Sequence, residues 1–141
     1  MTNSKLGAHY LRQALIRREF IRLALERAHH GVAMRLCQEA VELCLKAVLR
    51  FVGMEPPKWH DVGEILEKEK DRFPESFQQE IPFMKALSFE LRQSRELSFY
   101  GDAESDAPAS ELFSENDART AWEKTERVLL LCETMMTTKQ K

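Results

Sequence analysis

Glycine and proline are both scarce in this chain of 141 residues, which contains five of each. Because these residues dominate tight turns, their scarcity disfavours a strand-rich fold with many turns. The abundant residues, among them leucine, glutamate, arginine and alanine, are good helix formers. With 43% hydrophobic and 31% charged residues, the chain has the balance of an ordinary globular domain. The sequence therefore predicts a single all-α domain over residues 1–141.

Neither sign of charge is in large excess. Lysine and arginine total 21 against 23 for aspartate and glutamate, which gives a net charge of -2. A protein that coats nucleic acid carries a broad basic surface, so the composition argues against that class. Any contact with nucleic acid must therefore come from a few placed arginines.

Cysteines are few, and long apolar runs are missing. The three cysteines lack the spacing of a zinc site, and their odd number argues against a disulfide framework. The longest purely apolar run, Val128–Cys132, is far too short to cross a membrane, and the N-terminus lacks the apolar core of a secretion signal. We therefore expect a cytoplasmic protein without a metal, a cofactor or a membrane segment.

Apolar residues recur at steps of three and four along most of the chain, which is the period of an amphipathic helix. This spacing predicts helices over residues 4–30, 33–51, 61–71, 75–100 and 114–136. Pro82 predicts either a kink in the fourth helix or two collinear helices that meet there. Residues 101–113 are expected to form a polar loop, and residues 137–141 a frayed tail. The expected architecture is an up-and-down bundle of four to five helices.

Local signals refine three of these helices. Asp61 is expected to cap the start of the third helix, and Ser114 to Asp117 supply a capping signal for the last one. The first helix is expected to be buried along one side. The apolar residues assigned to that side are Leu11, Leu15, Ile16, Phe20, Leu23 and Ala24.

Three stretches of sequence follow one another in an order that is familiar from a known family. The first is the run from Ala33 to Ala47, with its alternation of alanine, acidic and apolar residues. The second is Gly53-x2-Pro56-Pro57-x2-His60-Asp61, and the third is Leu91-Arg92-x2-Arg95-Glu96-x3-Tyr100-Gly101-Asp102. Their order and spacing resemble the HEPN family of small helical nucleotide-associated domains, over nearly the whole chain.

This resemblance implies a helical bundle that pairs into a homodimer, with a cleft between the subunits that is lined by the fourth helix. It also implies a minimal nucleotidyltransferase as a partner protein. Many HEPN members cleave RNA without a metal, through an arginine and a histidine separated by four to six residues. This chain departs from that pattern, because neither Arg92 nor Arg95 is followed by a histidine at that distance.

The best candidates for ligand binding are Arg92, Arg95, Glu96 and Tyr100 in the fourth helix. An arginine at the end of a core stripe is costly unless it is paired or faces a cleft. One interpretation is a guanidinium that holds phosphate, with Tyr100 donating a hydrogen bond or stacking on a base. The other is an arginine–glutamate pair that fixes helix packing or the dimer.

Glu39, Glu42 and Lys46 lie at steps of three and four residues and could position a ligand in a dimer cleft, although such a charged stripe is more often a solvated helix face. His60 could take part in acid–base chemistry only if the protein is a nuclease. Its place at a capped helix start after two prolines has a sufficient structural explanation.

Three functions stay open at this point. The first is a homodimer that binds a nucleotide or nucleic acid through Arg92, Arg95 and Tyr100. The second is a toxin-type, metal-independent ribonuclease in which Arg95 stabilises phosphate charge and His60 or Tyr100 replaces the missing histidine. The third is a structural dimerisation partner without a ligand. Tyrosine has a reference pKa of about 10 and is a poor proton carrier at neutral pH, so binding is favoured over cleavage.

Overall fold

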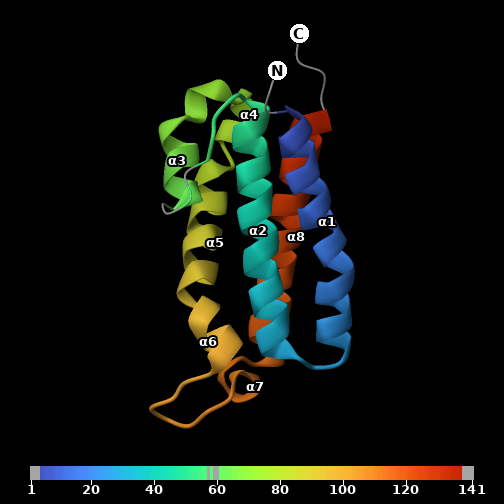
Figure 1. Cartoon of the computed structure of the whole chain (residues 1–141), viewed down its shortest axis with the longest axis vertical. Helices are drawn as coiled ribbons and strands as arrows, with labels where there is room; N and C mark the ends of the chain where they lie inside the picture. The colour runs from blue at the N-terminus through green and yellow to red at the C-terminus, as the bar shows by residue number, and fades with distance from the viewer. Residues whose placement is uncertain (1–3, 57, 59–60, 138–141) are drawn as a thin grey trace.

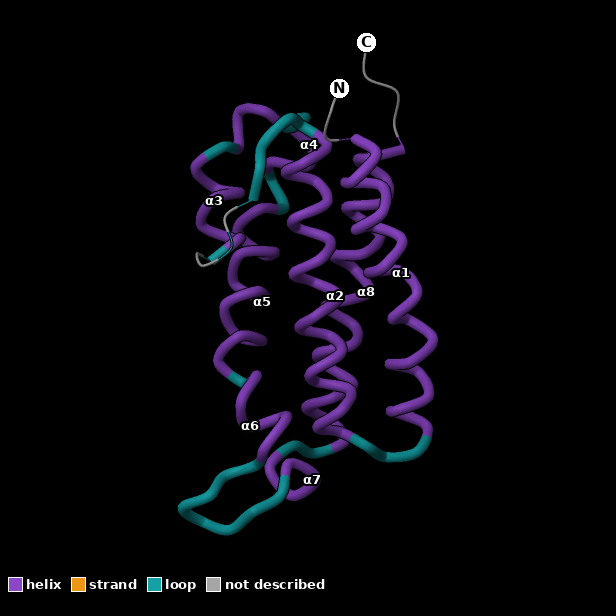
Figure 2. Tube along the Cα trace, viewed as in Figure 1, coloured by secondary structure: helices purple, strands orange, loops and turns teal. Residues whose placement is uncertain are grey.

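The structure is a computed structural model, which describes residues 4–56, 58 and 61–137. Within these residues, four long helices pack side by side in alternating directions (Figure 1). They are α1 (Ser4–Glu26), α2 (His30–Phe51), α5 (Ile81–Gln93) and α8 (Glu115–Thr137). The predicted all-α bundle is confirmed, and helices are the only regular elements drawn in the described part of the chain (Figure 2).

Short elements close the two ends of the bundle. Beside the start of α5 lie α3 (Val62–Lys68), a 3-10 turn (Lys70–Arg72) and α4 (Glu75–Gln78). The opposite end carries α6 (Arg95–Tyr100), the loop 101–108 and α7 (Ala109–Leu112). Helix α7 lies inside the segment that was expected to be a polar loop.

Helix α2 is the centre of the core, and its packing against α1 depends on small residues. Ala40, Cys44 and Ala47 of α2 are fully buried. A Cβ atom added to Gly7 of α1 would lie 3.0 Å from the carbonyl oxygen of Ala47, so a side chain at this position would crowd the α2 backbone. Glycine therefore allows the two helices to approach closely.

Both predicted helix caps are present. The side chain of Asp61 accepts a hydrogen bond from the backbone N–H of Gly63 at 2.9 Å. At the start of α8, the Asp117 N–H donates to Ser114 Oγ and the Ser114 N–H donates to Asp117 Oδ2, each at 3.0 Å. This reciprocal arrangement satisfies backbone donors that a helix start leaves without partners.

The expected buried side of α1 is partly wrong. Ile16, Phe20 and Leu23 are 54%, 52% and 45% exposed, whereas Ala14 and Ile21 are fully buried. Apolar residues occur on two sides of this helix, and the side with Gly7 and Ala14 faces α2. The side of α1 with small residues packs against α2 because it lets the two backbones approach closely, which brings more atoms into contact.

The predicted fourth helix is divided at two places. Pro82 lies in the first turn of α5, after α4 has ended, so the expected division near this proline is confirmed. A second interruption at Ser94, which was not expected, separates α5 from α6. None of the helices in the described ranges has the length and apolar character that are needed to cross a membrane.

Candidate functional site

A groove of about 210 Å³ lies between α1, α2 and α6. It brings Arg95 of α6 together with Glu42 and Lys46 of α2, three residues that the sequence singled out for ligand binding. We call it the Arg95 groove. Its lining residues are Arg17, Gln38, Glu39, Glu42, Leu43, Lys46 and Arg95.

The α2 wall of the groove is a polar stripe at steps of three and four residues. The opposite side of α2 is buried, so Glu39, Glu42 and Lys46 are left on the outer side. Glu42 holds two neighbours: its Oε2 lies 3.1 Å from Lys46 Nζ, and its Oε1 accepts a hydrogen bond of 2.8 Å from Gln38 Nε2. The charge of Lys46 is therefore already compensated.

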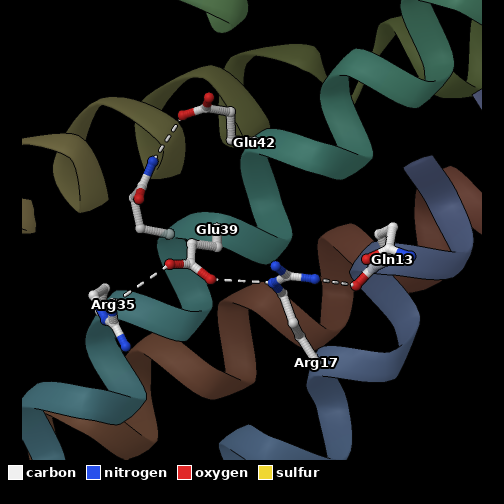
Figure 3. A network of polar contacts seen from close by, with 6 residues as sticks. Gln13, Arg17, Arg35, Glu39 and Glu42 are labelled. Atoms are coloured by element: carbon white, nitrogen blue, oxygen red, sulfur yellow. Dashed lines mark hydrogen bonds and ion pairs between the residues drawn. The ribbon is translucent and has the colours of Figure 1, made fainter.

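Arg17 forms the α1 wall and is held from two sides (Figure 3). Its Nε donates to Glu39 Oε1 at 3.1 Å, and its Nη1 donates to the carbonyl oxygen of Gln13 at 2.7 Å. The other carboxylate oxygen of Glu39 lies 4.0 Å from Arg35 Nη1. The Arg17–Glu39 contact thus joins α1 to α2, while the Arg35–Glu39 contact lies within α2.

Arg95 differs from the other cations of the groove. It is exposed, and its guanidinium has no ion pair or hydrogen bond with the residues that the structure describes. The lining has three cations and two carboxylates, so its formal charge is +1. Because Arg17 and Lys46 are paired with the two carboxylates, Arg95 carries the charge that an anion could neutralise.

Gln38 presents an unused hydrogen-bond acceptor beside this charge. Its side chain is only 3% exposed, and its Oε1 is buried without a hydrogen-bond partner among the residues described. A buried acceptor left without a donor costs about 1–3 kcal/mol. Sequence reasoning missed Gln38, since nothing in the local pattern distinguishes it from other polar residues of α2.

Phe99 extends the site along α6, one turn after Arg95. The guanidinium carbon of Arg35 lies 4.6 Å from the centroid of the Phe99 ring. The centroid of the Tyr100 ring lies 4.5 Å from that of Phe99, and Tyr100 is 77% exposed. Sequence reasoning missed Phe99, although its spacing of four residues from Arg95 was a usable signal.

A comparison with known families identifies the helical bundle. A family model of the HEPN domain matches residues 8–135. The chain belongs to the HEPN family. This match covers every element that lines the Arg95 groove and confirms the resemblance recognised in the sequence. Comparisons with curated proteins and with solved structures gave no match.

Three of the candidate residues of this HEPN domain lie outside the groove lining. Arg92 belongs to α5, and its Nη1 lies 4.0 Å from Asp61 Oδ1 in a separate hollow. The interruption at Ser94 places Arg92 and Glu96 on different helices. Glu96 and Tyr100 are both exposed on α6.

His60 lies outside the described residues, as do residues 138–141 of the expected frayed tail. In the part of the chain that the structure describes, no three histidine, cysteine, aspartate or glutamate side chains gather closely enough to hold a metal ion. The chemistry of the described groove is therefore that of cations, carboxylates and one amide.

Proposed function

We propose that this HEPN protein binds the phosphate of a nucleotide or of RNA in the Arg95 groove. The observation that carries this proposal is the guanidinium of Arg95, which lines a groove without a partner among the described residues. A guanidinium offers five N–H donors in a planar fork that suits phosphate oxygens. The two other cations are held by carboxylates and keep their places.

The aromatic residues of α6 support a nucleotide over a simple anion. Phe99 and Tyr100 are 53% and 77% exposed and follow Arg95 on the same short helix. Exposed aromatic rings beside cations are a common platform on which bases stack, and each stacked base contributes about 1–3 kcal/mol. Arg95 and these rings together would hold a phosphate and its base.

We further propose that the protein is a homodimer with a minimal nucleotidyltransferase as its partner. The family resemblance implies both. The dimer is also supported by the exposed apolar side chains of α6, Leu97 and Phe99, which are 41% and 53% exposed. A second copy that packs against α6 would deepen a groove which one bundle leaves shallow.

Binding is favoured over RNA cleavage. Cleavage through the 2′-hydroxyl needs a group that exchanges protons near neutral pH. The described lining of the Arg95 groove contains no histidine, and Tyr100 projects from α6 outside that lining. The ribonuclease hypothesis, with Arg95 and either His60 or Tyr100, is therefore the second candidate.

A titration of the protein with ATP and with a short RNA tests the proposal. We expect Arg95→Ala to weaken binding about tenfold or more, because a hydrogen bond to a charged group contributes about 1.5–3 kcal/mol. Arg119→Ala is the matched control, since Arg119 is an exposed arginine on α8 that pairs with Glu115 at 2.8 Å. Equal affinities for the wild type and Arg95→Ala would contradict the proposal.

The same RNA incubated with the protein in EDTA distinguishes the second candidate. Intact RNA is expected, whereas products that end in 2′,3′-cyclic phosphate and vanish with Arg95→Ala would show a nuclease. The mass in solution tests the dimer, and co-purification with a co-expressed nucleotidyltransferase encoded by a neighbouring gene tests the partner. A monomer at all concentrations would overturn the proposed homodimer. Separate elution of the two proteins would overturn the proposed nucleotidyltransferase partner.

A further inference from the structure

The Arg95 groove combines cations with hydrogen-bond acceptors, and we propose that it selects a phosphate that is attached to ribose. In this inference, which rests on the proposed phosphate site, Gln38 and Glu42 accept hydrogen bonds from the sugar hydroxyls while Arg95 holds the phosphate. Gln38 is then a residue that determines specificity.

The orientation of the Gln38 amide is fixed by its neighbour. An ionised carboxylate can only accept hydrogen bonds, so the side-chain nitrogen of Gln38 must face Glu42, where it donates at 2.8 Å. The amide oxygen therefore points elsewhere, and no donor among the described residues reaches it. A buried acceptor without a donor calls for a ligand that carries an O–H or N–H group.

The carboxylates of the groove also favour a ligand that carries hydrogen-bond donors. Glu39 and Glu42 would repel a bare phosphate, which offers mostly acceptor oxygens, yet both line the groove beside Arg95. Each carboxylate has about four acceptor positions, and the contacts to Arg17, Gln38 and Lys46 leave some of these positions unused. Binding ribose hydroxyls is an established use of carboxylates in nucleotide sites.

The groove has room for the phosphate end of a ligand. Its volume of about 210 Å³ corresponds to about seven water molecules at roughly 30 Å³ each. This volume accommodates a phosphate and part of a sugar, and because the groove opens to solvent, a base can extend beyond it. The base would remain outside, where Phe99 and Tyr100 expose their rings on α6.

The Gln38 oxygen is covered in the unbound protein, so binding requires a small rearrangement. Arg95 and Lys46 line the groove with long side chains that have many rotamers. Exposure of the Gln38 oxygen then requires one of these side chains to change its rotamer as the phosphate binds. Phosphate binding and recognition of the sugar are then coupled in one site.

Calorimetric titrations with two pairs of ligands test the selection. The first pair is AMP and 2′-deoxy-AMP, and the second is ribose 5-phosphate and 2-deoxyribose 5-phosphate, which lack a base. We expect the ribose compound of each pair to bind at least tenfold more tightly. In Gln38→Met, which keeps a long side chain but removes the acceptor, the ratio should fall toward one.

Two controls make the result unambiguous. Thr125→Val changes a fully buried polar residue of α8 outside the groove and should leave the preference for ribose unchanged. Far-ultraviolet circular dichroism shows whether Gln38→Met is folded, and the comparison within the wild type does not depend on that variant.

The possible outcomes distinguish a failure of ribose selection from a failure of the proposed phosphate site. Equal affinity for the ribose and deoxyribose compounds, with binding still dependent on Arg95, would overturn ribose selection and leave the phosphate site standing. A preference for AMP over 2′-deoxy-AMP that persists in Gln38→Met would overturn the role of Gln38. If neither nucleotides, sugar phosphates nor RNA bind, both the inference and the proposed function fail.

Discussion

The guanidinium of Arg35 on α2 lies over the ring of Phe99 on α6, with 4.6 Å between the guanidinium carbon and the ring centroid. Arg35 also faces Glu39, whose other oxygen accepts from Arg17. The ring is therefore held by a cation that belongs to the ion network of the central helix. Because Arg95 begins the same six-residue helix, this contact helps to set where Arg95 lies.

We predict that Phe99→Ala weakens nucleotide binding several-fold. The substitution removes a stacking surface and a cation–π contact that contributes about 0.5–2 kcal/mol. Phe89→Ala is a suitable comparison, because Phe89 has nearly the same exposure, 55% against 53%, and lies on α5 outside the Arg95 groove. Similar losses of affinity in the two variants would argue that the effect is not specific to α6.

Gly31→Ala should destabilise the fold, although alanine is the better helix former. A Cβ atom at this buried position of α2 would lie 2.7 Å from the Cβ of Ala109 on α7, so α7 would have to move. We expect the free energy of unfolding in urea to fall by about 1–3 kcal/mol, as for other overpacked sites.

The double variant Gly31→Ala with Ala109→Gly checks this explanation. Removing the Ala109 methyl group eliminates the 2.7 Å contact and leaves a contact of 3.1 Å with the Ser98 carbonyl oxygen, so the two changes together should cost less than the sum of their separate effects. Strictly additive losses would show that the α2–α7 contact is not the cause.

Two adjacent residues of α1 test which side of this helix faces the core. Ile21 is fully buried, so Ile21→Ala should lower the free energy of unfolding by about 2–5 kcal/mol. Phe20 is 52% exposed, so Phe20→Ala should change the free energy of unfolding by about 0.5 kcal/mol or less. Thermal or urea unfolding measures both, and a reversed order would mean that the other side of α1 faces the core.

Alkaline pH should destabilise the protein through Cys37. Burial raises the pKa of this thiol from 9.0 to about 12, and the neighbouring Thr125 side chain offsets part of the increase. Between these values the unfolded chain releases a proton that the folded chain retains, so stability is complete below pH 9 and falls as the pH rises toward 12. The slope for one thiol is about 1.4 kcal/mol per pH unit.

Comparing urea unfolding of the wild type and of Cys37→Ala between pH 8 and pH 10, on the order of one pH unit to either side of the thiol's ordinary value, isolates this contribution. Other groups that titrate in this range are common to both proteins. The difference in stability between them should shrink as the pH rises, and a constant difference would rule out the thiol as the cause.

Features that depend on neighbouring residues could be predicted from the sequence. The caps at Asp61 and Ser114 were predictable because each uses a side chain within three residues of the helix start. The division near Pro82 follows from the geometry of the proline ring itself. The buried side of α1 could not be chosen, because apolar residues on two sides of the helix compete and packing against α2 decides between them.

The candidate site depended on packing between distant segments, so the sequence could supply its residues but not their grouping. Glu42 and Lys46 are neighbours on α2, yet only the packing of α6 against α2 places Arg95 in the same groove. The interruption at Ser94 moved Arg92 to another surface, and no sequence signal indicated it. Gln38 became notable only through its burial and its missing donor.

The two sides of the Arg95 groove differ in how firmly they are anchored. Its α1 and α2 walls belong to helices of 23 and 22 residues, whereas Arg95 lies on a helix of six. Short segments with exposed side chains open locally at a lower free energy than the core. A ligand that joins both sides would raise that free energy, so slower hydrogen exchange at the amides of α6 would report occupancy of the groove before any change in the melting of the whole bundle.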